Sequence, residues 1–538
     1  MSDAPIKFGT DGWRAVIADD YTFENVERVS QATAKWLKED YGPSPEVVIG
    51  YDARFLSPQF AERAAQVLTQ AGVDVISSGE MVSTPAISWA TKALDCDAGI
   101  VITASHNPPE YNGFKIKAHF GGPAPPEMIA AVEKAVGPAS DLPSDEERRT
   151  SPPPAHHDVR SGYLNALQEA LDIDAIVNSG LTIAHDAMYG TGQGLVTELL
   201  GEEQVVPLRH ERNPGFHGLA PEPIEERLTD LSATVAESED CAAGLANDGD
   251  ADRIGMVDEN GDYVSSHRIL ALLVKYLHEE RGRSGDIVKT FSTTHLLGKM
   301  GERYGLSVET TPIGFKHIAR KMSEGNVLVG GEESGGIAAT GHVPERDGIY
   351  IGLLIAEMMV KRGKSLSALV DELLEEFGPH YNYRDDIHIR EDQKATVLDR
   401  LDSKGGLDAV DGHAVEEVQT LDGFKHVTEN GWLLIRPSGT EPVLRVYSEA
   451  ESRGTTRTQL LSVLFRLGRG NTKGPYRRAL ACVEHHEHML LVRFGDFHRI
   501  PQGRASPNRA VQRGRYVVRP GLRKYTAVRG DGPVVFNR

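Results

Sequence analysis

Three aspartates alternate along the segment Asn247–Arg253, which reads NDGDADR. Asp248, Asp250 and Asp252 would crowd like charges into one tight turn, and such carboxylates repel one another unless a cation lies between them. Hard oxygen ligands of this kind select Mg²⁺ or Ca²⁺. The spacing therefore predicts a divalent metal site, and Arg253 beside it suits a phosphate that shares the metal.

A helix-loop-helix calcium site is the main alternative for this segment, because Glu259 falls at the twelfth position of such a loop. Its sixth position is Arg253, however, where that loop needs glycine, and apolar runs typical of strands flank the segment. We therefore expect a Mg²⁺ site. A solvated acidic turn is the other alternative.

A second polar turn interrupts the run from Ile102 to Ile116, which reads ITASHNPPEYNGFKI. It does not match the G-x-S-x-G pattern of a serine hydrolase. The neighbours Ser105 and His106 are also poorly placed to act as nucleophile and base. A serine oxygen near Mg²⁺ could instead carry a phosphoryl group, because phosphoryl transfer depends mainly on positioning and charge neutralisation.

The same stretch contains Asn112-Gly113, which favours a hairpin turn. Lys115 would then return on the next strand, beside the serine turn. There it could neutralise the charge of a phosphate or act as a base. An ordinary surface lysine is the alternative.

Two further turns carry groups that suit a phosphorylated sugar. The sequence RPSGTEP offers an arginine fork, hydroxyls and an exposed backbone amide to a phosphate, from Arg436, Ser438, Gly439 and Thr440. The sequence GGEESGG offers carboxylate and hydroxyl groups to vicinal sugar hydroxyls, from Glu332 and Ser334. Each could alone be an ordinary turn. Together with the other two motifs, they fit an enzyme that moves a phosphate between two positions of one sugar.

The elements that must position these turns repeat along the chain. An apolar strand, a helical pattern and a second strand start near residues 46, 181 and 286, which is typical of parallel βαβ units. Each unit continues through another helix and strand into one of the polar turns. Because ligands of open α/β sheets bind beyond the carboxyl ends of strands, the three turns should share one cleft.

These patterns predict an α/β protein with three similar mixed α/β domains, largely parallel sheets and a smaller α+β C-terminal domain around a central cleft. The first domain carries the serine turn, the second the aspartates, the third the glutamates and the fourth the arginine turn. The expected boundaries are 1–150, 151–265, 266–378 and 379–465, followed by an atypical basic tail at 466–538.

Charge is distributed unevenly over the 538 residues, whose net charge is −20. From Arg453 onward the chain holds 18 Lys and Arg against 4 Asp and Glu, so the preceding body is strongly acidic. An acidic body disfavours nucleic acid. The basic tail could attract nucleic acid or a membrane surface. We favour the alternative interpretation, that the tail lies outside the working fold.

The location and the assembly of the chain are less strongly indicated. With three scattered cysteines and no signal-peptide pattern at the start, we expect a cytoplasmic protein. No apolar run is long enough to predict a membrane span. The sequence leaves the oligomeric state open.

Taken in their order along the chain, the serine, aspartate, glutamate and arginine turns resemble the motifs of the α-D-phosphohexomutases, the phosphoglucomutase/phosphomannomutase family. The segment FGTDGWR, Phe8–Arg14, resembles the family's amino-terminal signature and adds Arg14 to the site. The resemblance implies that Ser105 is the phosphoserine and a metal ligand with the three aspartates. It also implies that Lys115 is the general base and His106 an auxiliary.

The resemblance further implies that Glu332 and Ser334 bind sugar hydroxyls and that the turn at Arg436 grips the phosphate that is not transferred. The implied cofactors are Mg²⁺ and a hexose 1,6-bisphosphate, which acts as intermediate and activator. The implied substrate is a small sugar phosphate, with glucose favoured over mannose and glucosamine. A non-catalytic sugar-phosphate or calcium-binding protein on the same scaffold is the alternative.

One position departs from the family pattern. Many relatives have histidine where this chain has Gly336. The second acid/base is therefore open, with His317 and His342 as candidates.

Overall fold

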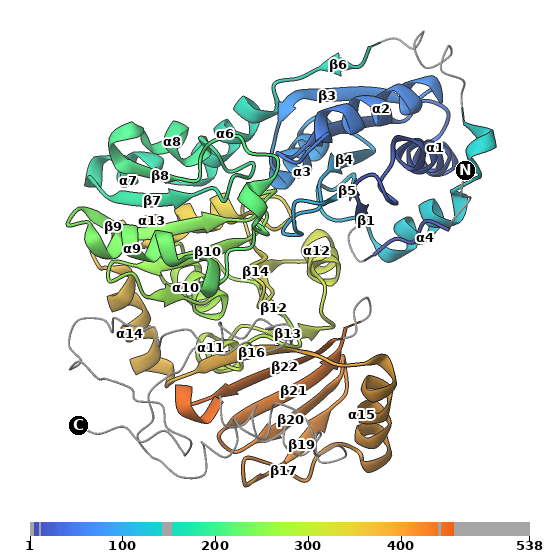
Figure 1. Ribbon diagram of the computed structural model, residues 1–538. Coiled ribbons are helices and arrows are strands. Elements are labelled where there is room, and N and C mark those ends of the chain that lie inside the picture. The colour runs from blue at the N-terminus through green and yellow to red at the C-terminus, as the bar shows by residue number, and fades with distance from the viewer. Residues whose placement is uncertain (1–4, 10–11, 143–152, 439–442, 457–538) are drawn as a thin grey trace, which may run out of the picture. The chain divides into compact units, whose positions relative to one another are not determined.

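The computed structural model describes residues 5–9, 12–142, 153–438 and 443–456, and its first domain is built around a six-stranded sheet (Figure 1). The strands are β1 (Trp13–Val16), β2 (Glu46–Tyr51), β3 (Asp74–Met81), β4 (Ala98–Ile102), β5 (Tyr111–Ala118) and β6 (Ala155–His156). The helices are α1 (Phe23–Tyr41), α2 (Ser57–Gln70), α3 (Thr84–Ala93) and α4 (Pro126–Ala135). Since β6 pairs with β3, the first sheet includes residues beyond the boundary expected at residue 150.

The second domain contains a five-stranded sheet and the third a four-stranded sheet. The second comprises α6 (Val159–Ala170), α7 (Ile173–Ser179), β7 (Thr182–Asp186), α8 (Leu195–Leu200), β8 (Val205–Leu208), α9 (Thr229–Glu237), β9 (Cys241–Asn247), β10 (Ile254–Asp258) and β11 (Tyr263–Val264). The third comprises α10 (Ser266–Glu279), β12 (Asp286–Thr290), α11 (Leu296–Tyr304), β13 (Val308–Thr311), α12 (Phe315–Glu324), β14 (Val327–Gly331), β15 (Ile337–Ala339), α13 (Gly348–Arg362) and α14 (Leu366–Phe377).

One strand order recurs in the three sheets. It reads β5-β4-β2-β3 in the first, β10-β9-β7-β8 in the second and β15-β14-β12-β13 in the third. In each sheet the first pair is antiparallel and the other two pairs are parallel. The repeat predicted from the sequence is therefore a repeat of topology. In all three domains, the polar turn connects the last parallel strand to the antiparallel strand beside it.

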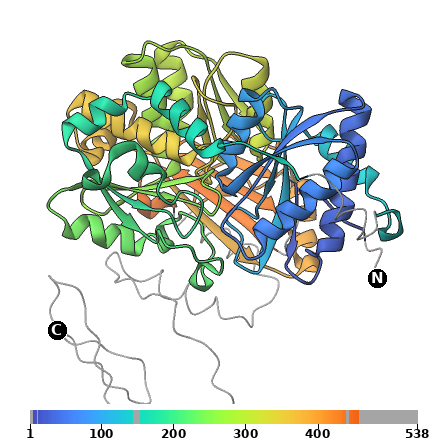
Figure 2. The same cartoon turned by 90° about the horizontal axis from the view of Figure 1, so that it is seen from above.

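Helices cover both faces of the first sheet, which is drawn in blue in Figure 2. Along β2, Val47 and Ile49 pack into a cluster with residues of α1, α2 and α4, whereas Val48 between them packs into a cluster with residues of α3. The alternation follows from the two-residue period of a strand. Since both faces of the sheet are buried, its loops have a rigid base.

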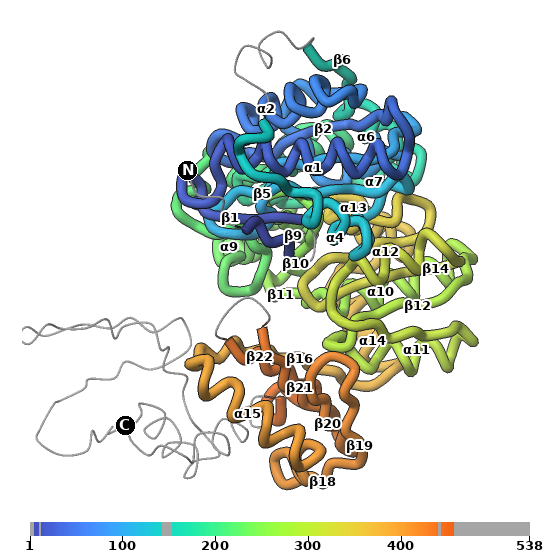
Figure 3. Tube along the Cα trace, turned by 90° about the vertical axis from the view of Figure 1, so that its right-hand side faces the viewer, coloured from blue at the N-terminus to red at the C-terminus, as the bar shows by residue number. Residues whose placement is uncertain are grey.

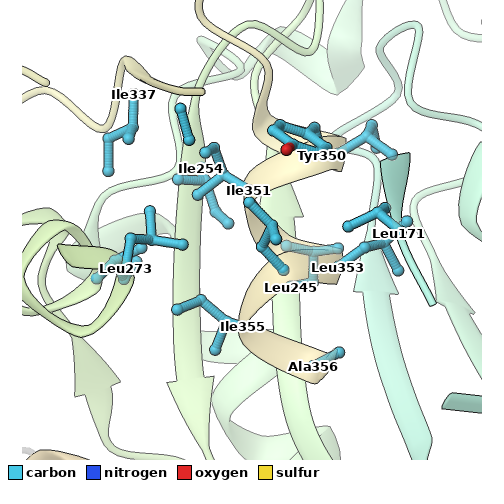
Figure 4. Close-up of a cluster of buried hydrophobic side chains, with 14 of the residues drawn as sticks. Leu171, Leu245, Ile254, Leu273, Ile337, Tyr350, Ile351, Leu353, Ile355 and Ala356 are labelled. Carbon is cyan, nitrogen blue, oxygen red and sulfur yellow. The ribbon is translucent and has the colours of Figure 1, made fainter. Parts of the chain in front are cut away.

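The core around α13 joins parts of the second and third domains (Figure 4). Leu353 and Ile355 of α13 are fully buried, and they share a cluster with Leu245 of β9 and Leu171, which follows α6. A Cβ at Gly352 would lie 2.3 Å from a methyl carbon of Leu245, so the glycine lets α13 approach β9 closely. Each fully buried Leu or Ile side chain contributes on the order of 2 kcal/mol by leaving water.

The fourth domain is built on an antiparallel sheet of order β16-β22-β21-β20-β19 (Figure 3). Its elements are β16 (Tyr381–His388), α15 (Glu391–Lys404), β17 (Ala409–Val410), β18 (His413–Ala414), β19 (Glu417–Gln419), β20 (Phe424–Thr428), β21 (Gly431–Pro437) and β22 (Val443–Ala450). Leu433 and Ile435 pack on α15, while Trp432 and Leu434 pack against Phe291 of the third domain. The architecture confirms three mixed α/β domains with largely parallel sheets and a different C-terminal domain.

A buried polar contact joins the third and fourth domains. Glu449 on β22 accepts hydrogen bonds from the backbone amide of His295 and from Trp432 Nε1, both at 3.0 Å. Lys425 Nζ donates to the carbonyl oxygen of Phe291 at 2.9 Å and lies 3.9 Å from the centre of the Trp432 ring. These contacts fix the sheet of the fourth domain on the third.

Two regions singled out by the sequence fall outside the described residues. They are the basic tail at 466–538 and the tip of the arginine turn, Gly439 and Thr440. Among the residues that the structure does describe, no helix combines the length and apolar character that a membrane span requires.

Candidate active site

The three polar turns of the first three domains contact one another. Ser105 Oγ donates to Asp248 Oδ2 at 2.8 Å, which joins the first turn to the second. The amide of Ile254 donates to the carbonyl oxygen of Gly335 at 3.1 Å, which joins the second turn to the third. A Cβ at Gly249 would lie 2.5 Å from the carbonyl oxygen of Ser105, so only glycine allows this approach. The shared topology of the sheets thus brings the serine turn, the aspartate turn and the glutamate turn together.

Ser105 sits in a turn that aims its hydroxyl at the aspartates. Its φ is 54°, in the left-handed region that is uncommon for residues other than glycine. Its amide donates to Thr103 Oγ1 at 2.9 Å, and its Oγ lies 3.3 Å from His106 Nδ1. The Ser105 side chain is therefore held between Asp248 and His106 and is 1% exposed.

The three aspartates are fully buried, and each can offer an oxygen so that all three atoms lie within 4.8 Å of one another. Two of their carboxylate oxygens, Asp250 Oδ1 and Asp252 Oδ1, are buried and accept no hydrogen bond from any described residue. Burial, together with the charges of the other two aspartates, raises the pKa of Asp248 well above its ordinary value. Buried, unpartnered oxygens with mutual repulsion fit a hard divalent cation.

Backbone contacts explain why the aspartate turn keeps its shape. The amide of Gly348, at the start of α13, donates to the carbonyl oxygen of Ala251 at 3.1 Å. A Cβ at Gly348 would lie 2.1 Å from the carbonyl oxygen of Arg253, so the glycine makes room for the turn. The turn is flanked by β9 and β10, and Glu259 bonds to Ser367 instead of closing the loop. A helix-loop-helix calcium site is therefore excluded.

Lys115 lies within this acidic cluster. Its Nζ donates to Asp250 Oδ2 at 2.7 Å and to Asp252 Oδ2 at 3.1 Å, and its side chain is 1% exposed. Burial raises the pKa of Asp250, but Lys115 and the hydroxyl of Thr84 outweigh it and lower that pKa below its ordinary value. The alternative that Lys115 is a surface lysine is wrong.

The route by which Lys115 reaches the site differs from the predicted hairpin. Asn112 and Gly113 lie inside β5, where they pair with Ala15 and Arg14 of β1. A Cβ at Gly113 would lie 2.5 Å from the carbonyl oxygen of Thr103 and 2.8 Å from that of Trp13. The glycine serves close packing between chain segments, and the turn precedes it.

Arg14 and Arg253 place positive charge near Ser105, with His106 beside them. Arg14 Nη1 donates to Asn107 Oδ1 at 2.9 Å, in the loop that carries Ser105. Arg253 donates its amide to Asp248 Oδ1 at 3.1 Å, and its buried Nε has no hydrogen-bond partner among the described residues. Burial and the positive charges of Arg253 and Arg14 lower the pKa of His106 well below its ordinary value. The imidazole is therefore neutral, and an anionic ligand would find cations nearby.

Arg346 is a further member of the site that the sequence analysis did not identify. Its Nη2 lies 2.7 Å from Asp252 Oδ2, and its Nη1 lies 3.8 Å from Glu332 Oε2. A Cβ at Gly336 would lie 2.4 Å from Arg346 Cδ, so Arg346 fills the space that a larger residue at 336 would need. The departure at Gly336 therefore has a structural reason. In the sequence, the only feature that could have pointed to Arg346 was the mixed charge of the segment PERDG that contains it.

The turn at 332–336 directs its two glutamates to different surroundings. Glu332 faces Arg346, whereas Glu333 accepts a hydrogen bond from Ser292 Oγ at 2.5 Å. Burial raises the pKa of Glu332 to about 7, although Arg346 opposes the shift. Ser334 is half-buried in the same turn. Of the two carboxylates, Glu332 therefore lies beside Arg346, which also pairs with Asp252.

We expect Glu332→Gln to change how stability depends on pH. The raised pKa means that Glu332 is protonated and neutral at pH 5 and must ionise in a buried site above about pH 7. In the metal-free state, the variant should be more stable than the wild type by about 3 kcal/mol at pH 8 and by less than about 1 kcal/mol at pH 5. Thermal unfolding in chelator at both pH values measures this; a variant that loses stability at pH 8 contradicts it.

The two histidine candidates for a second acid/base lie in other surroundings. His342 Nε2 is 2.8 Å from Asp347 Oδ2, and Asp347 also accepts a hydrogen bond from Tyr163 at 2.8 Å. His317 on α12 is half-buried, and burial followed by the charge of Lys316 lowers its pKa. In the described part of the chain, neither histidine has a hydrogen bond or ion pair to the three aspartates of the candidate metal site.

The arginine turn of the fourth domain is linked to the third domain. Arg436 Nε donates to Asp422 Oδ1 at 2.8 Å, and Asp422 Oδ2 accepts the amide of Ile313 at 2.9 Å. Ser438 is buried, and its carbonyl oxygen accepts Lys394 Nζ at 2.9 Å. These bonds hold the described part of the turn next to the loop between β13 and α12. The remaining two predicted residues lie outside the described part.

Comparison with known proteins gives the same domain order. Models of the four phosphoglucomutase/phosphomannomutase domains match residues 5–141, 161–261, 265–377 and 390–460. A phosphoglucomutase/phosphomannomutase from Thermococcus kodakarensis is 33% identical over 461 residues, which cover 84% of this chain and 96% of the relative. A protein of Pyrococcus abyssi, named a "probable phosphoglucosamine mutase", is 31% identical and is matched over 94% of its length by 83% of this chain.

A solved structure agrees with the sequence relatives. The crystal structure of a Thermus thermophilus protein, assigned there as a phosphomannomutase candidate, is 35% identical with a TM-score of 0.75. The match covers 90% of this chain and all of that one. With all four domain models matched in order, the chain belongs to the phosphoglucomutase/phosphomannomutase family, the α-D-phosphohexomutases.

Proposed function

We propose that this phosphohexomutase interconverts glucose 1-phosphate and glucose 6-phosphate through a phosphorylated Ser105 and glucose 1,6-bisphosphate. Mannose and glucosamine phosphates are the alternative substrates, because the relatives' names include both sugars. The observation that carries the proposal is the position of Ser105 Oγ, 2.8 Å from one of three buried aspartates that fit a divalent cation. A serine in that place can accept and return a phosphoryl group.

In the proposed reaction, phosphoserine 105 donates its phosphoryl group to the free hydroxyl of the hexose phosphate. The bond between phosphorus and Ser105 Oγ breaks as a bond to the sugar oxygen forms, and the hydroxyl gives up its proton. The bisphosphate then turns around and returns its other phosphate to Ser105. Because only the reacting end changes, one distal phosphate clamp can serve both halves of the reaction.

Mg²⁺ is the cation that we propose for the three aspartates, and when bound it would neutralise charge on the phosphoryl oxygens. Asp248, Asp250 and Asp252 would hold the ion, and the oxygen of Ser105 would lie next to it. Arg253 and Arg14 add positive charge next to the phosphoryl group. We assign the sugar hydroxyls to Glu332 and Ser334, and the distal phosphate to the turn that begins at Arg436 and Ser438.

Lys115 is proposed as the proton acceptor, as the family resemblance implies. In the structure Nζ is paired with Asp250 and Asp252. It can accept the proton only as the neutral amine, so the proposal requires Lys115 to have released its own proton before the sugar hydroxyl reacts. His106 is neutral and next to Ser105 Oγ, so it can orient the hydroxyl without adding charge. Substitutions at Lys115 test the first of these roles.

We expect Lys115→Met to lower kcat by about 10²- to 10⁴-fold, the usual contribution of a general acid or base. Lys115→Arg keeps the charge beside the aspartates but cannot release a proton at neutral pH, so it should remain similarly inactive. Steady-state kinetics on folded variants, checked by circular dichroism, measure both. Near-wild-type turnover of Lys115→Arg would show that Lys115 supplies charge alone.

The sugar specificity can be tested directly. The protein is incubated with Mg²⁺, a trace of glucose 1,6-bisphosphate and either glucose 1-phosphate, mannose 1-phosphate or glucosamine 1-phosphate, and the 6-phosphate is quantified. The proposal predicts the highest kcat/KM for glucose and a dependence on the bisphosphate. A higher kcat/KM for another sugar would overturn the glucose assignment and leave the mutase reaction intact.

A further inference from the structure

Arg54 is a buried arginine that binds the backbone of the Ser105 loop. It lies between β2 and α2 and is 1% exposed. Its two terminal nitrogens donate at 2.6–3.0 Å to four carbonyl oxygens: those of Ser105, Asn107 and Pro108 in the loop between β4 and β5, and that of Tyr111 at the start of β5. Its Nε donates to Asp52 Oδ2 at 3.0 Å. All five N–H groups of a guanidinium are therefore in use.

Asp52 fixes the guanidinium in this orientation. Besides Arg54 Nε, it accepts the Arg54 amide at 3.0 Å, Ser57 Oγ at 2.8 Å and Thr103 Oγ1 at 2.7 Å. The side chains of Asp52 and Arg54 are both fully buried, and their charges neutralise each other. Thr103 Oγ1 in turn accepts the amide of Ser105. Asp52 is thus connected to the Ser105 loop through Thr103 as well as through Arg54.

The Ser105 loop needs such a partner for two reasons. The left-handed backbone of Ser105 costs about 1–3 kcal/mol and persists only where the surroundings impose it. The carbonyl oxygens of Ser105, Asn107 and Pro108 lie outside any sheet, and without Arg54 these three and that of Tyr111 would lose a charged donor. Because the donors of Arg54 are all used by the protein, it is not placed to bind a phosphate.

A residue of the second domain covers the guanidinium. The ring of Phe216 lies 5.0 Å from the central carbon of Arg54, within the range of a cation–π contact. Phe216 is fully buried and has a φ of 46°, so its own backbone is held in an uncommon conformation. The contact ties the support of the serine loop to the domain that carries the aspartates.

We propose that Arg54 is a positioning residue of the mutase, which holds Ser105 so that its Oγ faces Asp248, with Phe216 setting the position of the guanidinium. The inference rests on the proposed phosphoserine reaction. It goes beyond stability, because it predicts a loss of phosphoryl transfer without a matching loss of substrate binding. Lysine cannot replace Arg54, since one ammonium group has three donors and no planar fork.

The test compares Arg54→Lys with Arg28→Lys. Arg28 is a buried arginine of the same domain that donates to Gly137 and Asn25 and belongs to no part of the site. For each variant we would measure kcat, KM for glucose 1-phosphate, Tm and the rate at which glucose 1,6-bisphosphate phosphorylates Ser105, followed by intact mass. Arg54→Lys should lower kcat and the phosphorylation rate by about 100-fold, the scale of a small misplacement, with KM changed by less than about threefold.

Arg28→Lys should keep wild-type kcat even if its Tm falls. Equal kcat in wild type and Arg54→Lys, or losses of kcat that follow Tm in both variants, would overturn the inference. If Arg54→Lys does not fold, Phe216→Leu takes its place and should lower kcat by about threefold to tenfold at constant KM; an unchanged kcat overturns the inference. A wild-type protein whose Ser105 is never phosphorylated would instead refute the proposed function itself.

Discussion

Ser105→Ala is expected to lower turnover by on the order of 10⁵-fold, the scale on which removal of a covalent nucleophile acts. The variant has no oxygen to carry the phosphoryl group, so the bisphosphate can neither form nor return its phosphate. Alanine meets the same left-handed backbone as serine, so the folded state loses little more than the hydrogen bond to Asp248, about 1 kcal/mol. A coupled assay for glucose 6-phosphate and intact mass after incubation with the bisphosphate measure the outcome.

Ser30→Ala is the matched control for this experiment. Ser30 is a fully buried serine of the same domain that donates to the carbonyl oxygen of Val26 within α1, away from the polar turns. The Ser30→Ala protein should retain turnover and gain one phosphate on incubation, whereas Ser105→Ala should gain none. A Ser105→Ala protein that still turns over substrate would show that another group carries the phosphate.

Removal of divalent ions is expected to lower kcat by about 10³-fold, because a bound cation stabilises several kcal/mol of charge in such reactions. The protein itself should also respond, since Asp250 Oδ1 and Asp252 Oδ1 are buried without a partner in the described structure. Mg²⁺ at 100 times its dissociation constant should stabilise the native state by about 2.7 kcal/mol. Thermal unfolding with and without chelator reads this out independently of activity.

Asp252→Asn separates metal binding from general screening of charge. It keeps a side chain of the same size but removes the charge that pairs with buried Lys115 and Arg346, so the metal-free variant should be less stable than the wild type. Its Tm should then respond little to Mg²⁺. Asp262 is exposed in the turn after β10 and offers a surface control as Asp262→Asn. Equal responses of both variants to Mg²⁺ would contradict a metal site at the aspartates.

The residue types of the site could be predicted because each polar turn follows an apolar strand in one recurring order. Ser105, Lys115 and the three aspartates are adjacent in the structure as their chemistry suggested. Arg54 and Arg346 could not be predicted, because their roles depend on carbonyl and carboxylate oxygens supplied by other parts of the chain. A local pattern cannot reveal such partners.

The fold shows the same limit. The alternation of apolar strands and helices was sufficient to predict three similar domains. Asn112-Gly113 was misleading, because the dipeptide satisfies close packing and a bond from Asn112 to Ser57 instead of a turn. The orientation of Glu332 towards Arg346 also required the structure, since neighbouring glutamates in one turn look equivalent in sequence.

Gly336 and Arg346 are coupled by packing. Any side chain at position 336 meets Arg346 Cδ, so a mutation there is disfavoured while the arginine remains. Shortening Arg346 first would remove the cation that Asp252 and Glu332 share, but it would open the space. A side chain introduced at position 336 therefore requires Arg346 to shift or to be shortened, so we expect substitutions at the two positions to occur together.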